Sequence, residues 1–298
     1  MGMLQTLSGE IERLAEKTSR SVVSVSSGHG NGSGVAWNKN TVVTASHVAR
    51  GADEVGIVTD DGRKLNAKVT GRFRRSDITV LTVDGALQPI EQGDSDKLKA
   101  GQLVLAFANP FGSRSSVTSG MITAANRSIG GWWGMIIENA VITDARVNPG
   151  YSGGPLVDAS GKMVGMNVAY FNKRGIAVPV NAISRVVERI AKGQPFKRAY
   201  LGIVSNPVSL PDEVAGDKRV GQDAGVMVYS VEDGTPAKKS GLAFGDVILR
   251  FGGKSISSSE DLTTLLGEEA IGRQTKVTVL RGGNVVDLDI TPTSGKEE

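Results

Sequence analysis

Residues 148–155 read N-P-G-Y-S-G-G-P, so that Ser152 has Gly150 two positions before it and Gly153 directly after it. Glycines on both sides of a serine let the backbone turn tightly enough to expose the hydroxyl and to aim successive N–H groups inward. An isolated stretch of this kind is more often a turn with an idle serine. Residues upstream decide between these two interpretations.

Two upstream stretches carry side chains that could activate a serine. Residues 44–47 read T-A-S-H and end one expected strand, and residues 76–81 read S-D-I-T-V-L and open another. A weak base, a carboxylate that fixes its tautomer and a serine are the three parts of an acyl-transfer site. His47 and Asp77 supply the first two parts, and Asp144 is a second carboxylate that could orient the base. We therefore predict an acyl-transfer site that includes Ser152.

The residue counts narrow the chemistry. The 298 residues contain no cysteine and only two histidines, His29 and His47. Cysteine nucleophiles, thiolate zinc sites and three-histidine metal sites are thereby excluded. The glycine-rich stretches 28–34 and 253–255 lack the glycine spacing of nucleotide-binding loops. We expect no metal and no cofactor, and His47 becomes the necessary base.

Strand-like runs dominate the first two thirds of the chain. The length suggests two domains, and 39 glycines indicate many tight turns. After an amphipathic helix in residues 1–20, strands are expected at 21–26, 34–37, 41–45, 55–59, 65–69, 78–83, 103–108, 117–123, 135–143 and 163–169. Many short strands without helices between them favour an antiparallel barrel or sandwich.

A helix over 181–192 ends this segment, with Asn181 as its cap and Gly193 as its stop. We expect a first domain at 21–193, a linker at 194–196 and a second domain at 197–294. The second domain has expected strands at 200–205, 226–231, 246–251, 276–281 and 285–290, with a hairpin turn at 281–284. A helix is expected at about 258–266, where Ser257 and Glu260 have capping-box spacing.

Along the chain, residues 44–47, 76–81 and 148–155 supply a histidine, an aspartate and a serine in that order, on a β-rich domain that a second domain follows. This arrangement resembles the HtrA (Deg) family of serine proteases. The resemblance extends from about Glu10 to Pro292. It implies a mostly β fold, with a chymotrypsin-like double β-barrel followed by a PDZ domain that has one or two helices. It also implies an ATP-independent endopeptidase that degrades unfolded or misfolded proteins in protein quality control and assembles as a homotrimer or a larger oligomer of trimers.

The same resemblance assigns roles to residues. His47 is the general base, Asp77 orients it, and Ser152 is the nucleophile. The N–H groups of Gly150 and Ser152 would form the oxyanion hole. Asp77 is preferred to Asp144 because it opens an expected strand between His47 and Ser152, in the order that the resemblance requires. An S1 pocket for a modest apolar P1 side chain would be lined by Val147, Met166, Asn167 and Val168.

In the second domain, residues 200–203 read Y-L-G-I and resemble the carboxylate-binding loop of the family's PDZ domain. Tyr200, Leu201, Gly202 and Ile203 would thus bind the C-terminus of a peptide, and the adjacent strand would pair with that peptide by β-augmentation. The helix at 258–266 would form the wall of the groove. The alternative is a plain buried strand, since two of the four residues are apolar.

Three features depart from the family pattern or leave the site open. Tyr151 stands where the family usually has a small polar residue, most often asparagine. Arg146 lies next to the expected S1 wall, and an inward orientation would shift the preference toward polar or acidic P1 residues. The loop at 130–134, which contains Trp132 and Trp133, is either a regulatory sensor or an adaptable surface loop.

The expected partners are unfolded polypeptides and peptide C-termini. Nucleic acid is not expected, because basic residues do not cluster with aromatic residues although the net charge is +3. We find no signal-peptide pattern and no 18-residue apolar stretch, so the chain is expected to be soluble as given. The resemblance favours an extracytoplasmic or membrane-attached protein from which a targeting segment was removed. A peptide-binding or chaperone-like scaffold with an inactive triad is the alternative function.

Overall fold

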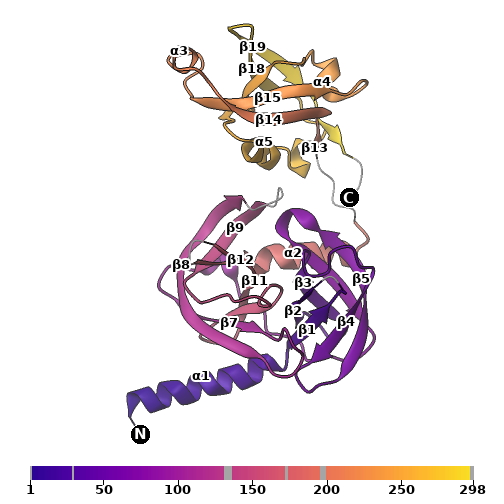
Figure 1. The fold of residues 1–298 in the computed structure, drawn as a ribbon, viewed down its shortest axis with the longest axis vertical. Coiled ribbons are helices and arrows are strands. Elements are labelled where there is room, and N and C mark those ends of the chain that lie inside the picture. Colours follow the sequence, from indigo (N-terminus) through magenta and orange to yellow (C-terminus); the bar gives the residue numbers. More distant parts are fainter. Residues whose placement is uncertain (1, 29, 131–135, 172–173, 195–198, 296–298) are drawn as a thin grey trace. The chain divides into compact units, whose positions relative to one another are not determined.

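The structure is a computed structural model that describes residues 2–28, 30–130, 136–171, 174–194 and 199–295. The chain divides into two compact units, Met1–Gln194 and Pro195–Glu298, which are considered separately (Figure 1). His29, the two tryptophans of the loop at 130–134 and residues 195 and 196 of the expected linker lie outside the described residues. Within the described part of the chain, no helix combines the length and the apolar character that crossing a membrane requires.

The first unit contains two closed β-barrels. One has the strand order β1-β2-β3-β6-β5-β4 and the other the order β10-β11-β12-β9-β8-β7. The strands of the first are β1 (Val22–Ser26), β2 (Asn31–Ala36), β3 (Thr41–Ala45), β4 (Glu54–Thr59), β5 (Lys64–Phe73) and β6 (Ile78–Val83). Those of the second are β7 (Leu103–Ala108), β8 (Ser116–Gly130), β9 (Ile136–Thr143), β10 (Pro155–Asp158), β11 (Met163–Phe171) and β12 (Arg174–Pro179). The double barrel predicted from the sequence is confirmed.

Buried side chains fill the barrel interiors, and in β4 they alternate with more exposed residues. Along β4, Val55, Ile57 and Thr59 are buried between more exposed neighbours. Gly34 faces the interior of the first barrel, where a Cβ atom would lie 2.8 Å from Val42 and 2.9 Å from Val25. A larger residue therefore does not fit at this position without a shift of its neighbours.

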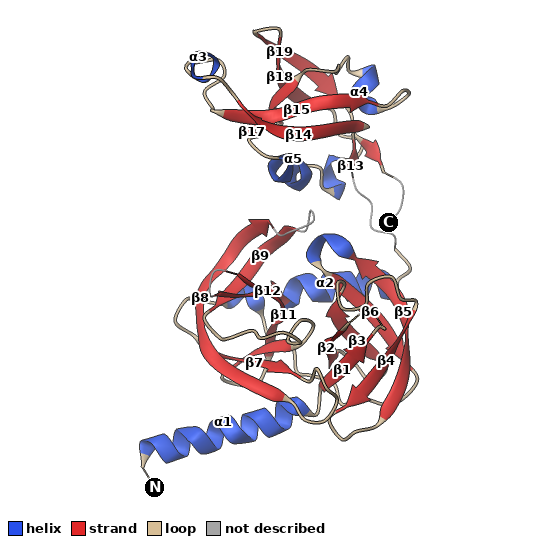
Figure 2. Cartoon of the chain, in the orientation of Figure 1, coloured by secondary structure: helices blue, strands red, loops and turns tan. Residues whose placement is uncertain are grey.

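Among the described residues of the first unit, two α-helices flank the barrels (Figure 2), and a single-turn 3₁₀ helix (Arg74–Ser76) precedes β6. Helix α1 (Met3–Ser19) leads into β1, and α2 (Val180–Ala191) follows β12. The prediction that Asn181 caps α2 is wrong, because Pro179 is the N-cap. Asn181 lies inside the first turn, where its side chain donates a hydrogen bond to Asp94 (2.9 Å). Gly193 follows α2 with a φ of +62°, as expected for the residue that stops a helix.

The second unit is an antiparallel sheet with short helices. Its main sheet has the order β14-β15-β16-β18-β19, β17 pairs with β16, and β13 pairs with β20. The strands are β13 (Ala199–Tyr200), β14 (Ile203–Ser209), β15 (Ala224–Val231), β16 (Val247–Phe251), β17 (Lys254–Ser255), β18 (Thr275–Arg281), β19 (Asn284–Ile290) and β20 (Thr293–Ser294). The helices are α3 (Asp212–Ala215), α4 (Pro236–Lys239) and α5 (Ser259–Leu265). The predicted hairpin turn joins β18 to β19, where Arg281 is opposite Asn284.

Two details of this unit differ from the sequence expectation. The strand expected at 200–205 is interrupted between β13 and β14, because Gly202 has a φ of +83°. The capping box of α5 is formed by Ser258 and Asp261, one residue later than expected. Asp261 accepts the backbone N–H of Ser258 (2.9 Å), and its own N–H donates to the Ser258 hydroxyl (3.1 Å).

Candidate active site

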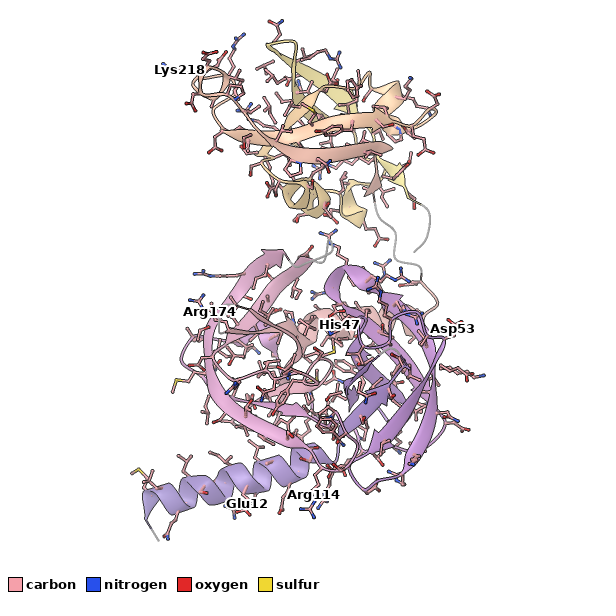
Figure 3. The ribbon with its side chains drawn as sticks, in the orientation of Figure 1. Glu12, His47, Asp53, Arg114, Arg174 and Lys218 are labelled. Atoms are coloured by element: carbon pink, nitrogen blue, oxygen red, sulfur yellow. The ribbon has the colours of Figure 1, made fainter. Side chains whose placement is uncertain are left out.

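His47 and Asp77 form a hydrogen-bonded pair in the first barrel. The pairing of β3 with β6 sets Ala45 opposite Ile78, so the residues that follow β3 and precede β6 lie next to each other. His47 Nδ1 lies 2.6 Å from Asp77 Oδ2, and the His47 backbone N–H donates to Asp77 Oδ1 (3.0 Å). The Asp77 side chain is 1% exposed, whereas the His47 side chain keeps 35% of its exposure. Figure 3 labels His47 among the side chains of the first unit.

The backbone of Asp77 serves this geometry. Its φ of +57° lies in the left-handed region, which aspartate tolerates better than most residues, and it directly follows the 3₁₀ turn Arg74–Ser76. With the proton on Nδ1, the imidazole presents a free Nε2 lone pair that can accept a proton. Of the two carboxylates that the sequence leaves open, Asp77 contacts His47, whereas Asp144 accepts the Met121 N–H (2.6 Å).

Ser152 lies in a tight turn that its glycines make possible. Gly150 and Gly153 have φ values of +90° and +88°. The Tyr151 N–H donates to Asn148 O (3.0 Å), which closes the turn before the nucleophile. A Cβ atom on Gly153 would lie 2.0 Å from the Ser33 carbonyl oxygen, so no side chain fits there.

The turn that carries Ser152 lies against the first barrel. The Ser33 N–H donates to the Ser152 carbonyl (2.9 Å). A Cβ atom on Gly32 would lie 2.6 Å from Val48 and 3.1 Å from Ser152 O, so the segments that carry His47 and Ser152 meet across Gly32. The Ser152 hydroxyl itself donates a hydrogen bond to the carbonyl oxygen of Val168 (3.3 Å).

The four residues predicted to line S1 have different surroundings. Val147, Met166 and Val168 are buried apolar residues. Asn167 is fully buried, and its amide donates to Gly154 O (3.0 Å) and Pro155 O (3.2 Å), so it braces the chain that follows the nucleophile. Arg146 is exposed, between the buried residues Ala145 and Val147.

Tyr151 points into the second barrel. It is 4% exposed and packs in the core cluster that contains Ala106, Val147 and Leu156. Burial raises the pKa of the Tyr151 phenol, and a hydrogen bond with Thr118 opposes that shift. The unusual residue next to the nucleophile is thus an internal packing element rather than a surface group.

Sequence reasoning missed Ser33, a fully buried residue of β2. Its hydroxyl donates to the Gly150 carbonyl (2.7 Å) and accepts the Asn109 N–H (2.8 Å). The only signal in the sequence is a serine at an interior position of a strand, between two glycines.

The Y-L-G-I segment of the second unit forms a turn beside an edge strand, in which Tyr200 is exposed, Leu201 and Gly202 are buried and Ile203 is half-buried. The carbonyls of Leu201 and Gly202 accept the N–H groups of Ala237 (2.8 Å) and Glu232 (2.9 Å), respectively. Tyr200 donates a hydrogen bond to Glu232, and this bond raises the pKa of the Tyr200 phenol.

The edge of this sheet is open to a peptide. In the described part of the second unit, the main sheet ends at β14, which pairs only with β15. Ile203 at the start of β14 packs against the cluster that contains Leu262 and Leu266 of the α5 region. An unpaired strand edge beside a helix is the arrangement that binds peptides by β-augmentation.

Comparison with known proteins gives matches in both units. A model of the trypsin-like peptidase domain matches residues 32–166, and one of the PDZ domain matches residues 175–291. The predicted fold class is thereby confirmed. A probable periplasmic DegP-like serine endoprotease of Halomonas elongata is 34% identical over 257 residues, which are 84% of this chain and 53% of that protein. A probable periplasmic Do/HhoA-like serine protease of Haemophilus influenzae is 35% identical over 269 residues, or 87% and 57% of the two chains.

Solved structures match over almost the whole chain. The HtrA-type protease AlgW with a tripeptide is 31% identical with a TM-score of 0.73, over 95% of this chain and 96% of that one. A serine endoprotease from Yersinia pestis is 27% identical with a TM-score of 0.71, over 96% and 98%. The chain spans about half the length of the curated relatives it matches.

Proposed function

This chain belongs to the HtrA family of serine proteases, and on that basis we propose that it is an ATP-independent serine endopeptidase that cleaves unfolded or misfolded polypeptides. The observation that carries the proposal is the buried Asp77 carboxylate on His47, in a segment that meets the turn carrying Ser152. Acyl transfer by a serine nucleophile requires a base with a fixed tautomer and a serine exposed in a turn, and these residues provide both.

The proposed reaction follows from the atoms in place. His47 Nε2 takes the proton of the Ser152 hydroxyl while Oγ attacks the scissile carbonyl carbon. The N–H groups of Gly150 and Ser152 stabilise the developing oxyanion. His47 then gives the proton to the leaving amine, and water hydrolyses the acyl-enzyme by the reverse sequence of proton transfers. The hydroxyl must release its bond to Val168 O before it can give its proton to His47.

We assign residues 21–193 to the protease domain, 194–196 to the linker and 197–294 to the PDZ domain. Val147, Met166 and Val168 would provide an apolar S1 wall, and the exposure of Arg146 favours an apolar over an acidic P1 residue. Asn167 would support that pocket through its bonds to the neighbouring carbonyls rather than line it.

The PDZ domain would bind peptide C-termini at residues 200–203, with the peptide added as a strand along β14. A chain that ends near Gly193 should still cleave short chromogenic peptides but should no longer be stimulated by added C-terminal peptides. Equal stimulation of the truncated and full chains would place the regulatory site in the protease domain.

The chain is also proposed to work as a homotrimer outside the cytoplasm. Met3 and Leu4 of α1 are 87% and 81% exposed, so this helix offers apolar surface for contacts between copies. The names of the curated relatives describe them as periplasmic. Light scattering of the wild type and of Leu4→Glu would show whether α1 contributes to an oligomer.

A fluorophosphonate probe tests the proposed activity, because only an assembled triad makes Ser152 reactive. Labelling of the wild type, and none of Ser152→Ala, is expected together with cleavage of casein as an unfolded substrate. A scaffold with an inactive triad is the second candidate, favoured by the hydroxyl bond to Val168. It would bind peptides at the PDZ domain and remain unlabelled.

A further inference from the structure

Ser33 of the first barrel forms hydrogen bonds with both Gly150 and Ser152 in the proposed catalytic turn. Its hydroxyl donates to the carbonyl of Gly150, and its backbone N–H donates to the carbonyl of Ser152. Its own carbonyl accepts the Thr44 hydroxyl (2.7 Å). Thus one fully buried residue of β2 contacts the residue that would donate to the oxyanion and the residue that would attack.

The contact with Gly150 is one of two hydrogen bonds that hold the peptide group between Gly150 and Tyr151. Gly150 has a φ of +90° and no side chain to restrict its torsions. The peptide group between Gly150 and Tyr151 is held at its carbonyl by the Ser33 hydroxyl (2.7 Å) and at its N–H by Asn148 O (3.0 Å). Without the hydroxyl, one of these two anchors is lost, and the direction of the adjacent Gly150 N–H is less restricted.

The hydroxyl is itself held in one orientation. It accepts the backbone N–H of Asn109, the residue after β7 (2.8 Å), so its proton is directed to Gly150. Asn109 and Gly150 are 76 and 117 residues away from Ser33 along the chain, so the bond joins distant segments of the first unit. A buried hydroxyl with one fixed donor and one fixed acceptor is a rigid connection.

We propose that Ser33 is a positioning residue for the oxyanion hole, acting through the Gly150 carbonyl. This inference rests on the proposed protease function. The Ser33 backbone bonds to Ser152 and Thr44 remain in Ser33→Ala, so the substitution removes only the hydroxyl contact. Loss of a direct oxyanion donor costs about 10²–10³ in kcat. Because Ser33 acts through a neighbour, we expect a smaller loss, about 10-fold, with KM changed by less than about twofold.

The test compares Ser33→Ala with Ser95→Ala. Ser95 is also buried, and its hydroxyl accepts the Asn181 N–H (3.2 Å); in the described part of the chain, none of its hydrogen bonds reaches residues 148–152. The two variants are measured for kcat and KM on a chromogenic peptide and for inhibition by a peptide boronic acid. The tetrahedral adduct of the boronic acid places an oxygen in the oxyanion hole. Ser33→Ala should lose boronate affinity by the same factor as kcat, and Ser95→Ala should keep both.

Hydrogen exchange separates this proposal from the protease assignment. Amide exchange of a peptide that covers residues 148–154 should be faster in Ser33→Ala than in the wild type, whether or not the chain hydrolyses peptides. Ser33→Cys keeps a weaker donor and should show the same changes to a smaller extent, which also serves if the alanine variant does not fold. Unchanged exchange in this segment, or unchanged kcat in an active chain, would overturn the role of Ser33. An inactive wild type with the expected exchange would contradict only the proposed function.

Discussion

Replacing Asp77 by asparagine should abolish most activity while the fold is retained. Asparagine has nearly the same shape and tolerates the left-handed backbone that Asp77 adopts at φ +57°. Alanine at this position would add a backbone cost of about 1–2 kcal/mol and would leave the His47 N–H without its Asp77 acceptor, so a loss of activity would mix stability with catalysis.

The structure determines which way the new amide would lie. The His47 backbone N–H, 3.0 Å from Asp77 Oδ1, requires an acceptor, so the amide oxygen takes that place. The amide nitrogen then faces His47 Nδ1, now 2.6 Å from Oδ2, and donates to it. The neutral imidazole must then carry its proton on Nε2, and a protonated Nε2 has no lone pair to accept the proton of Ser152. The same substitution in the trypsin template costs about 10⁴ in kcat, or about 5 kcal/mol.

The assay is kcat on a chromogenic peptide, with Asp144→Asn as the control carboxylate. The control should keep wild-type activity because Asp144 bonds to Met121 rather than to the base. Nitrogen-15 NMR of labelled histidine reads the tautomer directly, and only two histidines need assignment. An Asp77→Asn variant that keeps a tenth or more of the activity, or that leaves the proton of His47 on Nδ1, would refute this reasoning.

Three further outcomes are expected. Tyr151→Asn should lower stability by about 3 kcal/mol in a denaturant melt, because it empties an aromatic site in the core; an unchanged midpoint would show that the site refills. Gly202→Val should weaken peptide binding at least about 10-fold in calorimetry, since a Cβ atom there would lie 2.3 Å from Thr235. Equal affinity of the variant and the wild type would show that this turn is not part of the binding groove. The bond to Glu232 raises the pKa of Tyr200 above 10.0, so its stabilising effect is complete below pH 10 and is lost as the pH rises through the raised value. Ultraviolet titration against Tyr200→Phe would detect this late ionisation, and ionisation at or below the ordinary value would contradict it.

The sequence could predict what depends on local pattern. Alternating strands such as β4 and the stop of α2 at Gly193 follow from neighbouring residues, so they were found. Strands β10 and β12 were missed because each contains a proline, Pro155 at the start of β10 and Pro179 at the end of β12, and a proline in a run argues against a strand.

In the candidate site, too, residues with a recognisable local context could be predicted, and a residue defined by distant partners could not. His47, Asp77 and Ser152 stand in recognisable local contexts, and the structure brings the first two into contact. Ser33 has no such context, because its partners Asn109 and Gly150 are distant in the chain and only the closure of the barrels brings them together. Ser257 and Glu260 were expected to form the capping box of α5, and Ser258 and Asp261 form it instead. The sequence pattern does not separate the two pairs, because an aspartate at the third helical position can accept the capping N–H as a glutamate does.

Hydrolysis of an unfolded protein by the wild type and by Ser152→Ala tests the proposed protease most directly. The wild type should degrade casein without ATP. Ser152→Ala should lose on the order of 10⁶ in turnover, the scale measured when the triad serine of subtilisin is removed, while its melting temperature and peptide binding are unchanged. Substantial hydrolysis by the purified, folded Ser152→Ala variant would contradict the assignment of the nucleophile and with it the proposed mechanism.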